Sequence, residues 1–133
     1  MTGALANYGW YPSLLDLPNE SLYRELNRLE PASVAVRSEQ AIITAALTPL
    51  YPIFVAGDRL GDYWLADECG AANERILNFS VSPEQMRILL NEYCCHYVII
   101  SINSPYLSRF RSHPELFREV LKSEADAVFS VSY

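Results

Sequence analysis

The sequence has no long apolar run, and this absence limits what the chain can be. Half of its 133 residues are apolar, yet no stretch approaches the ~18 consecutive apolar residues of a transmembrane helix. No basic segment followed by an apolar one stands after Met1, so a secretory signal peptide is not predicted. We therefore expect this segment to be soluble and to insert into no membrane.

Positive charge is also scarce. Ten Lys and Arg residues stand against 16 Asp and Glu residues, for a formal charge of −6. The basic residues are scattered, so the stripe that would bind a phosphate backbone is missing and nucleic acid is not a predicted partner. An acidic domain gains nothing from an anionic membrane surface either.

Motifs for metal or cofactor chemistry are absent. The three cysteines, Cys69, Cys94 and Cys95, form no C-x-x-C pair, so neither a zinc site nor a thioredoxin-like motif is predicted. Phosphate-binding glycine loops, G-x-S-x-G and H-E-x-x-H do not occur. No metal, cofactor or catalytic residue is predicted. The cysteines are interpreted as buried apolar residues; in an oxidising compartment, Cys94 or Cys95 can instead pair with Cys69.

The segment from Ser82 to Ile102 gives the strongest structural signal. Ser82 with Gln85 forms a capping box and Pro83 suits the first helical turn. Apolar residues then recur at helical spacing, and Tyr97-Val98-Ile99-Ile100 follows as a continuous apolar run. The pattern predicts a helix that leads into a strand buried on both faces.

The rest of the chain supplies further elements of one domain, residues 1–133. Residues 1–18 read as an extended arm, and residues 58–79 as an irregular acidic segment with a short helix near Ala71–Leu77. The predicted helices are Asn19–Leu29 and Glu39–Leu47, the latter with a possible Ser38 cap. The predicted strands are Ala32–Val36 and Tyr51–Ala56, the second at an edge or starting late because of Pro52.

The last third of the sequence is ambiguous. Leu116, Phe117, Val120 and Leu121 have helical spacing, whereas a hairpin turning at residues 123–126 is the alternative. Residues 129–133 alternate apolar and polar side chains, as on an edge strand. The order of elements predicts an α/β fold: a three-layer sandwich of four to five mainly parallel strands with flanking helices. The Tyr97–Ile102 strand is expected at its centre, and the last strand at an edge, where antiparallel pairing is open to it.

Ligand-binding candidates lie where strands end. Asp58 and Asp62 lie in the acidic loop after the second strand, with Asp67 further on, and Asn103 follows the central strand. Such loops bind ligands in open α/β sheets, and their carboxylates can hold sugar hydroxyls or a hard cation. Tyr8 and Trp10 of the arm can stack on sugar rings. A solvated acidic loop and aromatic residues used for packing are the structural alternatives.

The Cys94-Cys95-His96 sequence suggests a thiol nucleophile with a base. A catalytic cysteine needs that base within hydrogen-bond reach and an open site. Because neighbours on a strand point to opposite faces, Cys95 and His96 are not expected to pair. Cys94 and His96 can share a face, but at the entrance to a buried strand. A structural role is therefore preferred.

The order of the elements is similar to that of a known class of proteins. The matching pieces are Leu29-Glu30-Pro31 before the first strand Ala32–Val36, the helix Ala41–Leu47, Leu50 to Asp58, Leu89–Tyr93 with Tyr97–Ser101, and the segments 116–120 and 128–133. In this pattern the chain resembles the soluble C-terminal extracytoplasmic domain of bacterial multi-pass membrane proteins, the glycosyltransferases that use polyprenyl-phosphate sugars and their relatives. The resemblance implies a C-terminal hairpin. It carries over no catalytic residue, because those lie in the membrane part.

Three functions follow as hypotheses. The first is a non-catalytic accessory or recognition domain of a bacterial membrane-bound, glycosyltransferase-like protein. Its partners would be a glycan or the membrane portion of its own parent chain, and its location extracytoplasmic. The second is a stand-alone module that binds a sugar or another small molecule. The third is a cysteine-dependent enzyme. A stand-alone protein without an export signal would be cytoplasmic.

Overall fold

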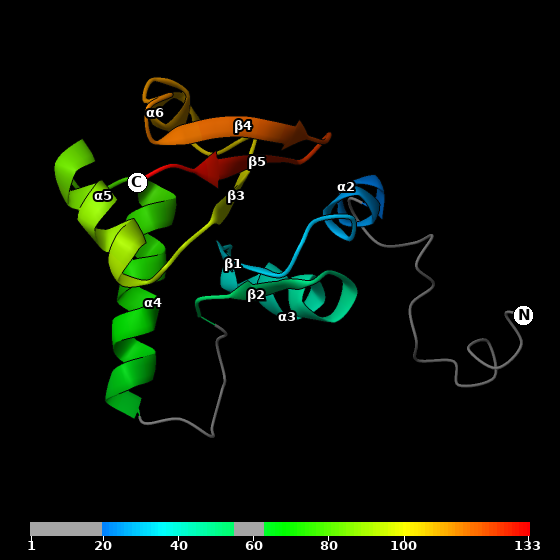
Figure 1. The fold of residues 1–133 in the computed structure, drawn as a ribbon, viewed down its shortest axis with the longest axis horizontal. Helices are drawn as coiled ribbons and strands as arrows, with labels where there is room; N and C mark the ends of the chain where they lie inside the picture. Colours follow the sequence, from blue (N-terminus) through cyan, green and yellow to red (C-terminus); the bar gives the residue numbers. More distant parts are fainter. Residues whose placement is uncertain (1–19, 55–62) are drawn as a thin grey trace, which may run out of the picture.

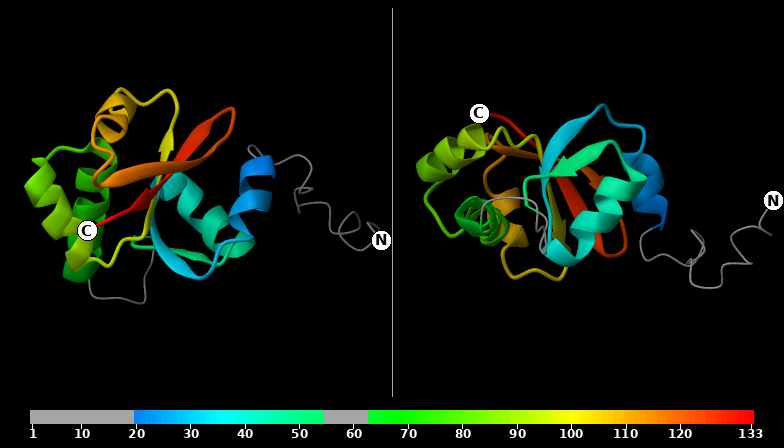
Figure 2. Two further views of the ribbon diagram at one scale, coloured as in Figure 1. Left: turned by 45° about the horizontal axis from the view of Figure 1, so that its top comes forward. Right: turned by 90° about the horizontal axis from the view of Figure 1, so that it is seen from below.

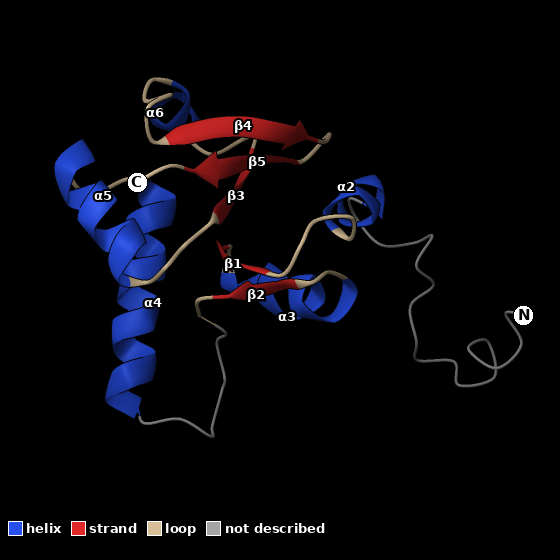
Figure 3. Cartoon of the chain, in the orientation of Figure 1, coloured by secondary structure: helices blue, strands red, loops and turns tan. Residues whose placement is uncertain are grey.

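The computed structural model describes residues 20–54 and 63–133, and for residues 63–67 the backbone alone. Within these ranges the chain is an α/β domain built around one five-stranded sheet (Figures 1 and 3). The strands are β1 Ala32–Ala35, β2 Leu50–Pro52, β3 Tyr97–Ser101, β4 Phe117–Lys122 and β5 Asp126–Val131. The helices are α2 Glu20–Leu26, α3 Ser38–Leu47, α4 Tyr63–Asn78, α5 Pro83–Glu92 and α6 Leu107–Arg111.

The sheet is mixed, with strand order β2-β1-β3-β5-β4. Strand β1 pairs in parallel with β2 and β3, whereas β5 pairs antiparallel with both β3 and β4. The central position of β3 and the edge position of β2 confirm the predictions. The expectation of a mainly parallel sheet is wrong, because the whole C-terminal part pairs antiparallel.

The last strand is antiparallel but not at an edge, since β4 takes the edge position. The misleading alternation lay in residues 129–133, where the chain leaves the sheet. Within β5, the residues from Asp126 to Phe129 are all buried, and only Ser130 and Val131 are half-buried. The alternation therefore marks the end of β5, where the chain leaves the sheet, and does not mark a strand in an edge position.

The C-terminal hairpin replaces the helix that the spacing of Leu116 to Leu121 favoured. A register shift lies between Glu119 and Leu121, where Val120 is the extra residue of a bulge. The bulge moves the apolar pattern by one position and imitates helical spacing. Ser123 closes the turn: its N–H donates to the Asp126 carbonyl at 2.8 Å, and its Oγ accepts from the Asp126 N–H at 3.0 Å.

Helix α5 and its cap are as predicted. The Ser82 side chain accepts a hydrogen bond from the Gln85 N–H at 3.2 Å, and Pro83 opens the first turn. Met86 and Leu90 are buried.

Helix α3, by contrast, begins at Ser38 itself. Arg37 occupies its N-cap without a side-chain cap bond, so the expected Ser38 cap is wrong.

Helix α4 is much longer than the short helix expected within an irregular segment. It spans 16 residues and includes Asp67, which sequence analysis placed in an acidic irregular stretch. Gly70 weakened the helical signal. A Cβ at this glycine would lie 3.2 Å from the ring of Phe54, so the close approach of that ring favours glycine. Burial of Ala72, Ile76 and Leu77 then stabilises the helix more than local propensity does.

Two hydrophobic clusters form the core, and the helices that contribute to them lie on opposite faces of the sheet (Figure 2). The first contains buried residues of α4, α5 and α6, and the second contains buried residues of α2 and α3. In β3, Val98 and Ile100 belong to the first cluster and Ile99 to the second. This alternation explains why the strand is a continuous apolar run.

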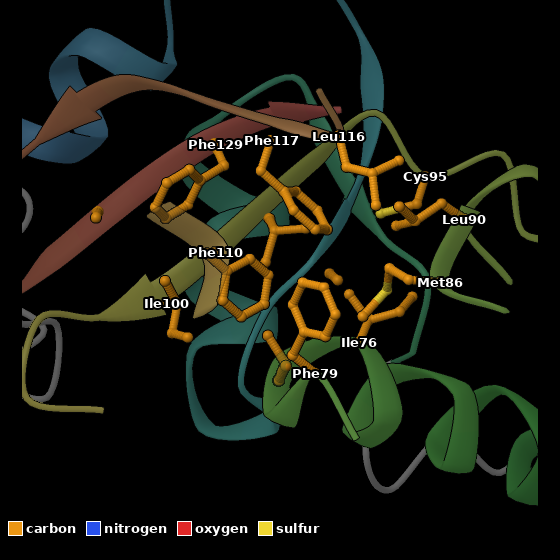
Figure 4. Close-up of a cluster of buried hydrophobic side chains, with 14 of the residues drawn as sticks. Ile76, Phe79, Met86, Leu90, Cys95, Ile100, Phe110, Leu116, Phe117 and Phe129 are labelled. Carbon is orange, nitrogen blue, oxygen red and sulfur yellow. The ribbon is translucent and has the colours of Figure 1, made fainter. Parts of the chain in front are cut away.

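Four phenylalanines fill the first cluster (Figure 4). The Phe110 ring lies centrally, 4.7 Å from that of Phe117, 5.4 Å from that of Phe79 and 5.5 Å from that of Phe129, between ring centroids. The Phe79 contact is edge-on, an arrangement that aromatic quadrupoles favour. The four rings join α4, α6 and both strands of the hairpin.

Helices α4 and α5 are followed by residues in the left-handed conformation. Phe79 has φ 45° and Cys94 has φ 50°. In each case an N–H one residue further on reaches back five residues, from Ser80 to the Arg75 carbonyl and from Cys95 to the Leu90 carbonyl. These are Schellman ends, in which glycine is the usual residue at the left-handed position. Because the Cys94 side chain is exposed, it gains little packing to offset its backbone strain.

Replacing Cys94 with glycine is expected to stabilise the protein, because glycine adopts positive φ without a Cβ clash. The free energy of unfolding should be about 1 kcal/mol higher for the glycine variant than for the alanine variant, after allowing for the greater conformational freedom of glycine in the unfolded chain. Urea unfolding of Cys94→Gly and Cys94→Ala measures it. Alanine removes the same thiol but keeps the strain, so equal stabilities of the two variants would contradict the prediction.

Candidate functional site

Of the six residues proposed from the sequence, the structure describes Asn103 and the backbone of Asp67, whereas Asp58, Asp62, Tyr8 and Trp10 lie outside the described residues. The backbone of Asp67 belongs to α4, near its start. Asn103 is exposed in the turn after β3, where its N–H donates to Ser101 Oγ at 3.2 Å.

A crevice does exist where the expectation placed ligand binding, at the carboxyl ends of strands. Neighbouring strands β1 and β3 are parallel, but β1 continues into α3 and β3 continues into α6. Those two helices contribute to different faces of the sheet. The divergence of the two connections makes a topological switch point, which is where open α/β sheets hold ligands.

The crevice has a volume of about 280 Å³ and three walls. Residues 37–39 form the first, at the start of α3. The end of α4 supplies the second, with Glu74, Leu77 and Asn78, and the turn after β3 supplies the third, with Ser101, Ser104 and Tyr106. Asn73 ties the α4 wall to the sheet, because its Nδ2 donates to the Val36 carbonyl at 3.0 Å.

Arg37 is held in the crevice by a polar network behind it. Its Nη2 lies 3.3 Å from Asp126 Oδ1, and its Nε donates to Gln40 Oε1 at 3.0 Å. Gln40 Nε2 in turn donates to Asp126 Oδ2 at 3.1 Å. The Asp126 side chain is 0% exposed, whereas that of Arg37 is 37% exposed. A buried carboxylate needs such a partner, and the pair fixes the guanidinium between α3 and β5.

The network continues away from the crevice to α2. Gln40 Nε2 lies 3.4 Å from the phenol oxygen of Tyr23, a buried residue. Burial is the largest influence on the Tyr23 phenol and raises its pKa. Tyr23 therefore stays neutral at physiological pH and acts as a fixed hydrogen-bonding group.

The third wall presents oriented hydroxyl groups. Ser101 Oγ accepts from the Asn103 N–H, and Ser104 Oγ accepts from the Tyr106 N–H at 3.1 Å. These bonds orient both side chains, and a hydroxyl group that accepts a hydrogen bond still carries a proton that it can donate. The Tyr106 side chain is 38% exposed. Across from it, Glu39 and Glu74 are exposed carboxylates.

The crevice lies at the end of the strands where sequence analysis expected a ligand, but most of its lining residues were not among the candidates. The Asn103-Ser104-Pro105 turn was recognised, although Ser104 and Tyr106 line the crevice and Asn103 does not. Arg37 directly follows the first predicted strand, so the rule that selected the acidic loop would also have selected Arg37. Glu74 was missed because the extent of α4 was missed.

The Cys94-Cys95-His96 segment does not form an activated nucleophile. Cys95 is buried, and burial raises the pKa of its thiol to about 12. Its Sγ donates to the Tyr97 carbonyl at 3.2 Å. His96 Nδ1 lies 3.0 Å from Ser33 Oγ, but that hydroxyl donates to the Cys94 carbonyl. The imidazole is then the donor in the Ser33 contact, and neither group activates the other.

Cys95 is buried as expected, but Cys69 is half-buried and Cys94 is exposed, so the interpretation of the cysteines as buried residues is wrong for Cys94. All three cysteines are free. Within residues 20–54 and 63–133, no group of three or more His, Cys, Asp or Glu side chains could hold a metal ion. Among the helices in those ranges, none combines the length and the apolar character needed to cross a bilayer.

Comparison with models of known protein families and with curated proteins finds no match to this chain. The crevice and its chemistry therefore carry the functional argument.

Thiol labelling should separate the two adjacent cysteines. The pKa of Cys95, raised from 9.0 to about 12, lowers its thiolate fraction at pH 8 about 1000-fold, and burial blocks access. The Cys94→Ser variant should therefore show slow disulfide exchange at Cys95 with a chromogenic reagent, becoming fast in guanidinium. Cys94 in the parent protein should react readily. If Cys95 reacts as fast in the native protein as in guanidinium, the prediction that burial protects it is wrong. Peptide mapping identifies the cysteine that is modified.

Proposed function

We propose that this chain is a recognition domain that binds a small polar ligand in the crevice between β1 and β3. The observation that carries the proposal is the convergence of polar side chains from three separate segments on a hollow at a switch point. Arg37 provides donors, Glu39 and Glu74 provide acceptors, and the serines provide groups that can do both.

Binding is favoured over catalysis by the state of the candidate nucleophiles. The Cys95 thiol is buried and protonated, and the Ser33 hydroxyl is committed to a backbone carbonyl. The crevice side chains are suited to holding a ligand by hydrogen bonds. A cysteine-dependent enzyme is accordingly the weakest of the three hypotheses.

We further propose that the domain is part of a bacterial membrane-bound, glycosyltransferase-like protein and faces the extracytoplasmic side. The support is the sequence resemblance together with the order of elements, which ends in the hairpin that the resemblance implied. We also propose that the domain is a three-layer sandwich, which the two core clusters support. The partners of the domain would be a glycan or the membrane portion of the same parent chain. A stand-alone binding module is the alternative, and the same crevice would serve it.

Ligand binding can be tested by titrating ¹⁵N-labelled protein with four probe classes: neutral sugars, sugar phosphates, nucleotides and amino acids. At least one probe should shift the amide signals of Arg37, Ser101, Ser104 and Tyr106 together. The Glu74→Trp variant should abolish the shifts by filling the crevice. Glu68→Trp, on the same helix but away from the crevice, should preserve them. Absence of any shift at millimolar concentrations of all four classes would refute the binding proposal.

Attachment to a membrane protein can be tested separately in the gene. If the domain belongs to a membrane-bound protein, the reading frame upstream of residue 1 should encode several apolar segments of about 20 residues. Determining that upstream sequence is sufficient. An in-frame stop codon directly ahead of residue 1 would leave the stand-alone module as the remaining form of the proposal.

A further inference from the structure

The charges of the crevice are unbalanced toward the negative. One cation, Arg37, is accompanied by the exposed carboxylates of Glu39 and Glu74 on the walls. Behind it lies the buried carboxylate of Asp126, 3.3 Å from Arg37 Nη2. Arg37 therefore brings no net positive charge to the crevice, because the Asp126 carboxylate already neutralises it. Glu39 Oε1 also lies 3.7 Å from Arg37 Nε, so one guanidinium stands among three carboxylates, and an anionic ligand would meet a net negative charge.

The hydrogen-bonding groups indicate what kind of ligand is complementary. The Glu39 and Glu74 carboxylates only accept and so require donors from the ligand. Arg37 only donates and requires an acceptor; its Nη1 takes part in none of the bonds to Gln40 or Asp126. Ser101 and Ser104 retain hydroxyl protons. A ligand hydroxyl group donates and accepts at once, whereas phosphate and carboxylate groups lack protons to donate.

Tyr106 adds a flat apolar surface to these polar groups. It lies between Ser104 and α6, and its side chain is partly exposed beside the crevice. Its own backbone N–H bond to Ser104 Oγ fixes the start of the turn that carries it. An aromatic face offers contact area to the C–H surface of a ring while the phenol group stays available for hydrogen bonding.

We infer that the ligand of the crevice is an uncharged, hydroxyl-rich ring compound, a sugar without phosphate or carboxylate groups. The inference rests on the proposed binding function and specifies its ligand class. In this arrangement the ring lies against Tyr106, hydroxyl groups bridge Arg37 to the wall glutamates, and Asp126 acts as a positioning residue that neutralises Arg37. The wall glutamates exclude anions.

The probes that test the ligand class are glucose, mannose, galactose and N-acetylglucosamine, each compared with glucose 6-phosphate and glucuronate. Isothermal titration and amide shifts at Ser101, Ser104 and Tyr106 give the affinities. We expect a neutral sugar to bind at least about ten-fold more tightly than either anion. Equal or tighter binding of an anion at these amides would overturn the inference.

Charge-removing variants test the cause of the discrimination. Glu39→Gln combined with Glu74→Gln keeps an accepting oxygen at each position but removes both charges. Affinity for the neutral sugar should fall, because an amide oxygen accepts hydrogen bonds more weakly than a carboxylate. The preference over glucose 6-phosphate should nevertheless fall toward unity, because the repulsion of the anion is removed. The matched control, Glu68→Gln with Glu92→Gln, makes the same change in net charge at exposed sites outside the crevice and should keep the preference. A similar loss in both variants would assign the effect to overall charge.

Tyr106 variants test the ring contact. Tyr106→Phe keeps the ring and should retain most of the affinity for the neutral sugar, whereas Tyr106→Ala should lose about ten-fold. Equal affinity of the alanine and phenylalanine variants would exclude stacking. The failures are distinguishable: if an anion binds more tightly than every neutral sugar, the crevice remains a binding site and only the ligand class is wrong. If no probe shifts the crevice amides, the binding function itself fails.

Discussion

The fold depends on one strand that must be apolar on both faces. Val98 and Ile100 of β3 pack into the cluster of four phenylalanines, while Ile99 packs into the cluster beneath α2 and α3. The same strand pairs in parallel with β1 and antiparallel with β5. A polar residue at any of these three positions would lose its hydration without gaining a partner. Because both halves of the sheet join at β3, the crevice beside its carboxyl end depends on it too.

Local signals in the sequence predicted two elements correctly. The Ser82 cap and the helical spacing after it identified α5, and the apolar run identified β3. Errors arose where a distant contact decides the structure. Gly70 interrupts the helical pattern of α4 because it accommodates the Phe54 ring, and the Val120 bulge makes an edge strand resemble a helix. Neither contact can be read from a window of neighbouring residues.

The same difference between local signals and distant contacts applies to the candidate site. Sequence analysis expected polar groups after the carboxyl ends of strands, where the crevice lies, and it recognised the turn after β3. It could not determine which strand ends lie side by side. That follows from strand order, in which β1 lies between β2 and β3 and β5 follows β3. This order brings Arg37 to Asp126, 89 residues further along the chain, and no spacing rule links such a pair.

The walls of the crevice have a consequence for folding. The hairpin of β4 and β5 and its pairing with β3 join residues close in sequence, so this half should organise early. Strand β1, in contrast, can complete its pairing only after residues 97–98 have been synthesised and placed. The Arg37–Asp126 pair joins these two halves, so it can form only after they have come together. The crevice is therefore among the last features to form, and a molecule that binds it would slow unfolding of the whole domain rather than protect one segment.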